Sequence, residues 1–483
     1  MAHRTEPRRP TRVEHDSLGD VEVPLHSYYG AQTARALENF RISDIPIGHF
    51  PVFIRSLAMI KMAAARANRR IGDLPQDKCD AIVQACQDIV NGGLSDQFVL
   101  DVFQGGAGTS TNMNMNEVIA NRALEYLGRS KGEYEYLHPN NDVNLSQSTN
   151  DVYPTAIRLA VRFAYVELSR ALVRLARAFE RKADEFASVV KLGRTQLQDA
   201  VPMTLGQEFM AFAVTLHEDV ARLDEAAALL MEVNLGGTAI GTGITADPAY
   251  AATVIEELSA LAGLKVVGAA NLVEACWDTG VFVLFSGTLK RTAVKLSKIS
   301  NDLRLLSSGP RGGFGEINLP HMQPGSSIMP GKVNPVIPEM VNQVAFQVIG
   351  SDLVVTLAAE AGQLQLNAME PVIVFNLLQS ISLMANAVNT LTDRCIVGIT
   401  ANPENCLRHL ESSTALATAL TSLLGYEESA LLAHEILSTG KTMRQLLDER
   451  AGLSPELVEQ ALDTFAMTRP SRLRPKARTT APR

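Results

Sequence analysis

The sequence predicts a mainly α-helical protein built around long central helices. Aromatic residues make up only 5% of the 483 residues, while alanine and leucine are abundant, a bias that favours helix over sheet. Long helices are expected from about Thr155 to Val190, Val336 to Glu360 and Pro371 to Asp393. The first would be roughly 54 Å long at ~1.5 Å per residue. Residues 372–388 are apolar on nearly all sides, so we expect a helix bundle that continues across subunits.

The chain divides into three expected regions. Residues 1–150 mix short segments with helices and carry a polar loop around Thr109. Residues 151–404 form the central region of long helices and carry the loop GSSIMPGKVNP. Residues 405–483 form a small helical C-terminal region that ends in a basic tail.

Charge and cysteine content indicate which kinds of partner and which cellular compartment to expect. The net charge is −8, and the two chain ends are basic, so the body between them is strongly acidic. Such a body repels nucleic acid and anionic membranes. The five cysteines are odd in number and form no CxxC pair, which indicates reduced thiols. With neither a secretory signal nor an uncharged apolar run of 18 residues, we expect a cytoplasmic protein without membrane or nucleic-acid partners.

Four polar loops carry the candidate chemistry, and each is expected to lead into a helix. Helix N-termini present free N–H groups and a partial positive charge, which bind anions. Serine, threonine and asparagine add neutral donors, and Lys332 adds a full charge. If these loops converge, they form a pocket for a small dianion such as a dicarboxylate. The loops are residues 105–117, 146–154, 193–202 and 324–335, with Pro154 and Pro335 expected in first helical turns.

Other catalytic motifs do not fit. The segment GGAGTS lacks the lysine of a phosphate-binding loop. The chain has neither an HExxH motif nor a metal-binding Cys/His spacing, and it has no Gly-x-Ser-x-Gly nucleophile elbow. The chemistry therefore has to use hydroxyls, amides and one lysine, and we expect neither a metal nor a cofactor.

The segment GSSIMPGKVNP, residues 325–335, resembles the signature of the aspartase/fumarase superfamily. The resemblance runs from about Arg12 to about Pro470. The segments GGAGTSTNMNMNEV, SQSTNDVYPT, GRTQLQDAVPMTLGQEF and AAEAGQLQLNAMEPV are more similar to ammonia-lyases than to fumarases. The resemblance implies a three-domain fold whose long central helix bundle is completed by tetramerisation, with each active site built from three subunits.

The resemblance also implies roles for individual residues. Ser326 matches the general base, and it shares a mobile loop with three substrate ligands, Ser327, Lys332 and Asn334. Gln196 matches a substrate-binding position that is histidine in fumarases and in some aspartases. The implied donors around the two carboxylates and the amine are Thr109, Ser148, Thr149, Asn150 and Thr195.

The implied reaction is β-elimination of ammonia from L-aspartate to give fumarate. Removal of the Cβ proton yields an aci-carboxylate with two negative charges, which preorganised donors must stabilise. A protonated amine leaves as neutral ammonia and needs no acid, whereas hydroxide must be protonated; Gln196 cannot supply that proton.

Two features favour the alternative, a fumarate hydratase acting on L-malate. They are the segment HPNND, residues 138–142, and Gly331 of the signature loop. A catalytically silent structural protein is a third interpretation, and the intact Ser326–Lys332 loop argues against it.

Overall fold

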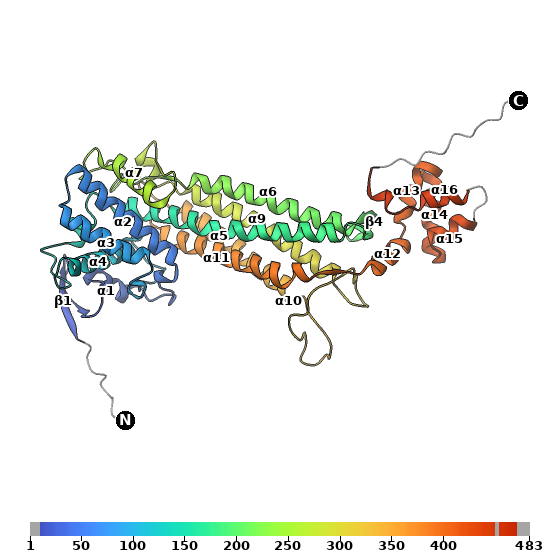
Figure 1. The fold of residues 1–483 in the computed structure, drawn as a ribbon, viewed down its shortest axis with the longest axis horizontal. Helices are drawn as coiled ribbons and strands as arrows, with labels where there is room; N and C mark the ends of the chain where they lie inside the picture. The colour runs from blue at the N-terminus through green and yellow to red at the C-terminus, as the bar shows by residue number, and fades with distance from the viewer. Residues whose placement is uncertain (1–9, 450–453, 471–483) are drawn as a thin grey trace, which may run out of the picture. The chain divides into compact units, whose positions relative to one another are not determined.

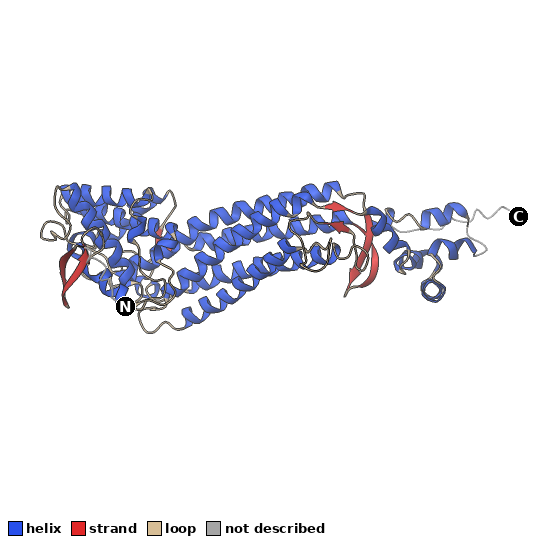
Figure 2. Ribbon diagram, turned by 90° about the horizontal axis from the view of Figure 1, so that it is seen from below, coloured by secondary structure: helices blue, strands red, loops and turns tan. Residues whose placement is uncertain are grey.

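The computed structural model describes residues 10–449 and 454–470, and the chain separates into two compact units. The first unit comprises Met1–Ser169, Ala221–Ala293 and Phe346–Met384, and the second comprises the remaining segments. Helices dominate the described residues, and the strands are short (Figures 1 and 2). The predicted mainly α-helical class is therefore confirmed. The predicted division near residues 150 and 404 stays a prediction.

Five long helices contribute residues to both units. Three of them confirm the long helices expected from the sequence, although the first begins six residues earlier and ends five residues earlier than expected because a strand starts at Val190. The five are α5 (Thr149–Glu185), α6 (Leu205–Leu229), α9 (Gly280–Leu306), α10 (Val336–Glu360) and α11 (Glu370–Arg394).

Polar contacts join these helices inside the first unit. The Tyr165 hydroxyl on α5 donates to Asp224 Oδ1 on α6 at 2.7 Å, and Lys290 on α9 pairs with Asp352 on α10 at 2.5 Å.

The shorter helices of the first unit are α1 (Ala31–Asn39), α2 (Pro51–Ile71), α3 (Gln76–Val90), α4 (Thr109–Tyr126), α7 (Tyr250–Ala262) and α8 (Leu272–Ala275). Strands β1 (Thr11–Asp16) and β2 (Gly19–Pro24) form an antiparallel hairpin, and β5 (Glu232–Val233) pairs in parallel with β6 (Val267–Gly268).

The second unit adds two small antiparallel sheets and a C-terminal group of short helices. Strand β3 (Val190–Thr195) pairs with β4 (Gln198–Thr204), and β7 (Ile317–Asn318) pairs with β8 (Thr400–Ala401). The helices are α12 (Pro403–Glu411), α13 (Ala415–Leu424), α14 (Tyr426–Thr439), α15 (Met443–Glu449) and α16 (Pro455–Ala461). Leu192 of β3 packs into one buried cluster with Leu410, Leu420 and Leu432. The hairpin is thereby anchored to the C-terminal helices.

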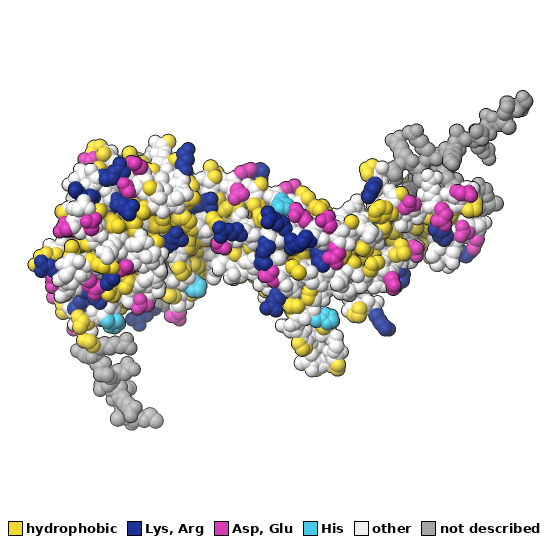
Figure 3. Space-filling view, in the orientation of Figure 1, with side chains coloured by type: hydrophobic (Ala, Val, Ile, Leu, Met, Phe, Trp, Pro, Cys, Tyr) yellow, Lys and Arg dark blue, Asp and Glu magenta, His cyan; other side chains and the backbone are white. Residues whose placement is uncertain are grey.

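Helix α10 leaves an apolar stripe uncovered. Phe346, Leu353 and Leu357 are 63%, 60% and 59% exposed, and their spacing places them along one side of the helix. Exposed hydrophobic side chains also appear among charged ones in the space-filling view (Figure 3).

By length and composition alone, α10 and the helix Glu370–Gly398 are long and apolar enough to cross a membrane, but the most apolar window of the latter is 61% buried inside the protein.

Candidate active site

The candidate loop at residues 146–154 is organised by the buried carboxylate of Asp151 in the first turn of α5. Its Oδ1 accepts from the N–H of Ser148 at 3.0 Å, and its Oδ2 accepts from the N–H groups of Gly236 and Thr238 at 3.1 and 2.9 Å. Burial raises the pKa of Asp151 to about 6, although these three N–H donors oppose the shift. The ionised carboxylate fixes the loop before α5 to the segment 236–238.

Pro154 lies inside α5 and not in its first turn, so the expectation for this proline was wrong. Helix α5 begins at Thr149. A proline has no N–H for the carbonyl four residues earlier, which here belongs to Asn150. The Asn234 side chain replaces the missing donor, with its Nδ2 2.9 Å from that carbonyl oxygen. The helix therefore starts earlier than the proline alone indicates.

Three predicted donors lie together at the start of α5. The hydroxyl of the buried Thr149 accepts from Asn112 Nδ2 at 3.0 Å. Ser148 Oγ accepts from the N–H of Asn150 at 3.2 Å, and Asn150 Nδ2 donates to the Ala239 carbonyl at 2.7 Å. The hydroxyls of Ser148 and Thr149 each accept one hydrogen bond and retain a proton to donate.

Thr109 is the first residue of α4 and is exposed. Its hydroxyl donates to the Gly106 carbonyl at 2.7 Å. The preceding Gly108 has a φ of +88°, and a Cβ there would lie 2.3 Å from the Tyr153 ring. Only glycine fits, so close packing against α5 fixes the start of α4.

The signature loop of the second unit closes on itself. The Gly325 N–H donates to the Lys332 carbonyl at 2.7 Å, and Asn334 Nδ2 donates to the Gly325 carbonyl at 2.7 Å. A Cβ at position 325 would lie 2.6 Å from the Lys332 carbonyl oxygen, so this closure requires glycine. The loop thus holds Ser326, Ser327 and Lys332 on one short closed segment.

Ser326 Oγ receives two backbone N–H groups within this loop, from Ile328 at 3.1 Å and from Met329 at 3.0 Å. Hydrogen bonds donated to an oxygen favour its anionic form. The arrangement also forms a local serine turn, so its geometry is preset without a ligand. Ser326 is half-buried, while Ser327 and Lys332 are exposed.

A cavity of about 760 Å³ lies beside the signature loop in the second unit. Two predicted ligands, Lys332 and Asn334, line it, together with Arg304, His321 and Glu339. The volume is ample for a four-carbon dicarboxylate, and Lys332 and Arg304 provide positive charge for an anion.

Thr195 is the last residue of β3, and Gln196 lies in the exposed turn between β3 and β4. Gln196 and Leu197 both have positive φ, at 56° and 61°, a backbone that two-residue hairpins normally fill with Asn-Gly. Two non-glycine residues in this conformation indicate stored strain, which is often found at functional positions.

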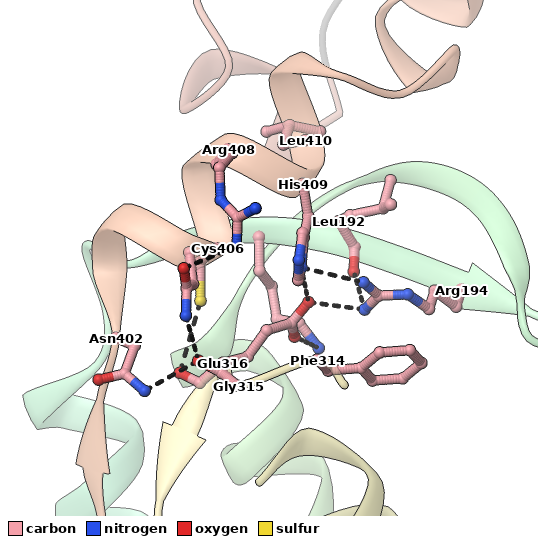
Figure 4. Close-up of polar contacts among 12 residues, drawn as sticks. Leu192, Arg194, Phe314, Gly315, Glu316, Asn402, Cys406, Arg408, His409 and Leu410 are labelled. Atoms are coloured by element: carbon pink, nitrogen blue, oxygen red, sulfur yellow. Dashed lines mark hydrogen bonds and ion pairs between the residues drawn. The ribbon is translucent and has the colours of Figure 1, made fainter. Parts of the chain in front are cut away.

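Glu316 anchors this hairpin through Arg194 of β3 (Figure 4). Its side chain is fully buried, and Arg194 Nη1 lies 2.7 Å from its Oε1. Lys191 Nζ lies 3.1 Å from Oε2, and His409 Nδ1 of α12 lies 3.2 Å from Oε1. Burial raises the pKa of Glu316, but the charges of Lys191 and Arg194 outweigh it and leave that pKa below its ordinary value. Glu316 thus ties the residue before Thr195 to the C-terminal helices.

The ten predicted site residues fall into two groups. The first unit holds Thr109, Ser148, Thr149 and Asn150; the second holds Thr195, Gln196, Ser326, Ser327, Lys332 and Asn334. Sequence reasoning missed Asp151, Asn112, Glu316 and the segment 236–239. Asp151 supports Ser148 from within the same loop. Asn112 and the segment 236–239 support the start of α5 from distant parts of the chain, and Glu316 likewise holds Arg194, the neighbour of Thr195. The glycines of segment 235–243 are the sequence signal for the contact made by the segment 236–239, because they indicate a close backbone approach.

We expect Glu316→Gln to lower the free energy of unfolding at pH 7 by about 3 kcal/mol, because it leaves the half-buried Arg194 without this carboxylate and leaves the buried Lys191 paired with Glu208 alone. A lowered folded-state pKa gives stability that is present above the usual value of 4.5 and is lost as the pH falls through the folded-state pKa. The difference between wild type and variant, measured by thermal unfolding, should therefore shrink at acid pH. Glu404→Gln, at an exposed position on α12, is the control. A difference that is constant between pH 7 and pH 4 would contradict the ion-pair role.

Comparison with known proteins identifies the family. Residues 19–350 match the lyase family model, and residues 416–469 match the fumarase C C-terminus model. The aspartate ammonia-lyase of Pseudomonas aeruginosa is 60% identical over 92% of this chain and 94% of its own, and that of Escherichia coli is 52% identical over 92% and 93%.

Solved structures agree with this assignment. The Brucella melitensis protein described as fumarate lyase:delta crystallin bound to cobalt is 60% identical, with a TM-score of 0.94 over 95% of this chain and all of its own. A class II fumarase from Schistosoma mansoni is 35% identical, with a TM-score of 0.90 over 95% and 99%. The chain belongs to the aspartase/fumarase superfamily of lyases.

Proposed function

We propose that this protein is an aspartate ammonia-lyase that converts L-aspartate to fumarate and ammonia without a cofactor. The observation that carries the proposal is its 52–60% identity to aspartate ammonia-lyases over more than nine-tenths of the chain. Its identity to the Schistosoma mansoni fumarase is 35%. The site chemistry fits the same reaction.

Ser326 is the proposed base that removes the Cβ proton. A serine hydroxyl is basic enough only as an alkoxide, which needs nearby positive charge and N–H donors. The N–H groups of Ile328 and Met329 already point at its Oγ, and Lys332 lies on the same closed loop. Closure of this loop over substrate would expel water and strengthen these interactions.

The start of α5 is the proposed binding site for a substrate carboxylate. Ser148 and Thr149 each have a hydroxyl proton to donate, and the helix N-terminus adds favourable N–H groups. Donors aimed at a carboxylate stabilise the aci-carboxylate more than the ground state, because its charge is doubled. Thr109 and Asn150 are proposed to complete this subsite, and Thr195 and Asn334 to bind from the other loops.

The leaving group separates ammonia-lyase from hydratase. Ammonia departs without an acid, so Gln196 at the β3–β4 turn is compatible with it. A leaving hydroxide would require a proton donor there. The segment 138–142 and Gly331 keep fumarate hydratase as the second candidate.

The wild-type protein should form fumarate from L-aspartate much faster than from L-malate, followed by the ultraviolet absorbance of fumarate. Gln196→His should still deaminate L-aspartate, because the amine leaves without an acid. Wild-type turnover that is faster with L-malate than with L-aspartate would reject the ammonia-lyase assignment.

Ser326→Ala should leave the fold intact and reduce kcat by at least a thousandfold, as expected when a base acting in the transition state is removed. Ser438→Ala, at an exposed position on α14, is the control and should retain full activity. Circular dichroism and melting temperature check the fold. A Ser326→Ala variant with a tenth of wild-type turnover would show that another group is the base.

We further propose a homotetramer in which different subunits contribute to each active site. The apolar stripe of α10 supports this proposal, since exposed apolar patches of this kind mark protein–protein contacts. Bacterial relatives and the charge pattern support a cytoplasmic enzyme without nucleic-acid or membrane partners. L-Aspartate and fumarate are the proposed small-molecule partners.

Leu353→Glu should dissociate the tetramer, measured by sedimentation, because it places a charge in a buried interface. Leu437→Glu on α14 is the matched control, since Leu437 is 75% exposed.

Mixing Ser326→Ala and Thr195→Ala chains should restore activity in up to about a quarter of sites if the two residues of one site come from different subunits. Unchanged sedimentation of Leu353→Glu, or a fully active monomer, would refute the assembly.

A further inference from the structure

Lys61 is a buried lysine that the proposed chemistry does not use. It lies on α2 with its side chain fully buried. Its ammonium donates to two amide oxygens, Asn144 Oδ1 at 2.9 Å and Gln147 Oε1 at 3.0 Å. Burying a cation is costly unless the surroundings compensate it, and neutral amide oxygens compensate less than a carboxylate would. A lysine at this position therefore calls for an explanation beyond packing.

The ammonium begins a chain of hydrogen bonds that ends at Thr149. Asn144 Oδ1 accepts from Lys61 and also from Asn112 Nδ2 and Asn116 Nδ2, both at 3.1 Å. Asn112 Nδ2 then donates to Thr149 Oγ1 at 3.0 Å. Lys61, Asn144, Asn112 and Thr149 form a relay that lies wholly within the first unit.

Two partners set the direction of the bonds in this relay: the Lys61 ammonium, which only donates, and the Gln147 carbonyl, which accepts from Asn144 Nδ2 at 3.1 Å. An ammonium only donates, so Asn144 must present its oxygen and not its NH₂ group to Lys61. That oxygen in turn draws the NH₂ group of Asn112, which then faces Thr149. Because Thr149 Oγ1 accepts from Asn112, its own proton points elsewhere. Without the ammonium, the Gln147 carbonyl would be the one remaining partner named here that opposes the reversed orientation of Asn144.

We propose that Lys61 is a positioning residue for the elimination reaction, fixing the polarity of the Lys61–Asn144–Asn112 relay so that Thr149 donates its hydroxyl proton to a substrate carboxylate. This inference rests on the proposed function, in which Thr149 binds substrate. Lys61 acts through Thr149 and does not itself touch the reacting atoms.

Charged neighbours determine when the ammonium is present. Asp151 on α5 and Cys86 on α3 are the titratable groups that face Lys61, but burial raises the pKa of the Cys86 thiol and keeps it neutral. Burial lowers the pKa of Lys61 from 10.5 to about 7, although the charge of Asp151 opposes the shift. The free enzyme therefore loses the ammonium as the pH rises through about 7, and the relay loses its donor-only end. A bound dianion favours the ammonium, so the effect should appear in KM more than in kcat.

The test compares Lys61→Met, which removes the charge at similar volume, with the wild type. We expect KM for L-aspartate at pH 7 to rise about tenfold, the loss expected for one misdirected hydrogen bond to a charged group, with a smaller change in kcat. Lys78→Met on α3 is the matched control, because Lys78 holds the same segment through Asp142 at 2.8 Å but lies outside the relay. It should leave both constants near wild-type values.

A double-mutant cycle distinguishes positioning from a structural role. If Lys61 acts through Thr149, then Lys61→Met should add little to the loss caused by Thr149→Val. Additive losses would overturn the proposal. Lys61→Gln, whose amide can still donate to Asn144, should fall between wild type and Lys61→Met, and it provides the comparison if the methionine variant does not fold. The proposal would also be overturned if the KM of Lys61→Gln were as high as that of Thr149→Val and the losses caused by the two substitutions were additive.

Stability gives a readout independent of substrate. The unfolded chain keeps the lysine protonated up to about pH 10.5, while the folded protein releases this proton near pH 7. The wild-type melting temperature, relative to that of Lys61→Met, should therefore rise between pH 7 and pH 10. A flat difference would contradict the titration of Lys61. Failure of the wild type to deaminate L-aspartate would instead reject the proposed function and leave this stability test intact.

Discussion

The buried carboxylate of Asp151 is the interaction on which the first group of site residues depends. It holds the loop before α5 and the segment 236–238 together through three backbone N–H groups. Gly236 reaches the carboxylate with a φ of +95° and with Ala251 2.5 Å from where a Cβ would stand, so both conformation and space require glycine. Once this junction forms, Asn234 is placed to supply the hydrogen bond that Pro154 cannot. The hydroxyls of Ser148 and Thr149, the proposed carboxylate ligands, thus take their positions from the buried Asp151 beside them.

Two buried charges of opposite sign act on the same loop. Asp151 is ionised above about pH 6 and Lys61 is protonated below about pH 7. Near neutrality the loop is held at one end by a carboxylate that only accepts and at the other by an ammonium that only donates. The amides between them have one consistent orientation under these conditions, so polarity of the hydrogen bonds, and not only their number, is a property of this fold.

The sequence predicts the parts of this molecule that depend on local pattern. The long helices follow from apolar runs, and the signature loop follows from GSSIMPGKVNP, whose Gly325 leaves no room for a side chain. What could not be predicted depends on contacts across the chain. Glu316 and Arg194 meet from positions 122 residues apart, and Gln196 and Leu197 form a turn that their residue types disfavour. The start of α5 was misplaced because the rule for proline at helix starts holds only when no distant donor, here Asn234, replaces its N–H.

The proposed catalysis depends on hydrogen-bond donors and not on a proton-donating acid. In an ammonia elimination the charge that must be stabilised builds on a carboxylate, and the leaving amine carries its own proton. Asn112 donates to Thr149, which leaves the Thr149 hydroxyl proton for the proposed contact with a carboxylate. The N–H groups of Ile328 and Met329 point at Ser326, the proposed base, which would carry negative charge before it removes the Cβ proton. Glutamine at position 196 is compatible with this proposed chemistry, because ammonia elimination needs a hydrogen bond at that position and not a proton donor.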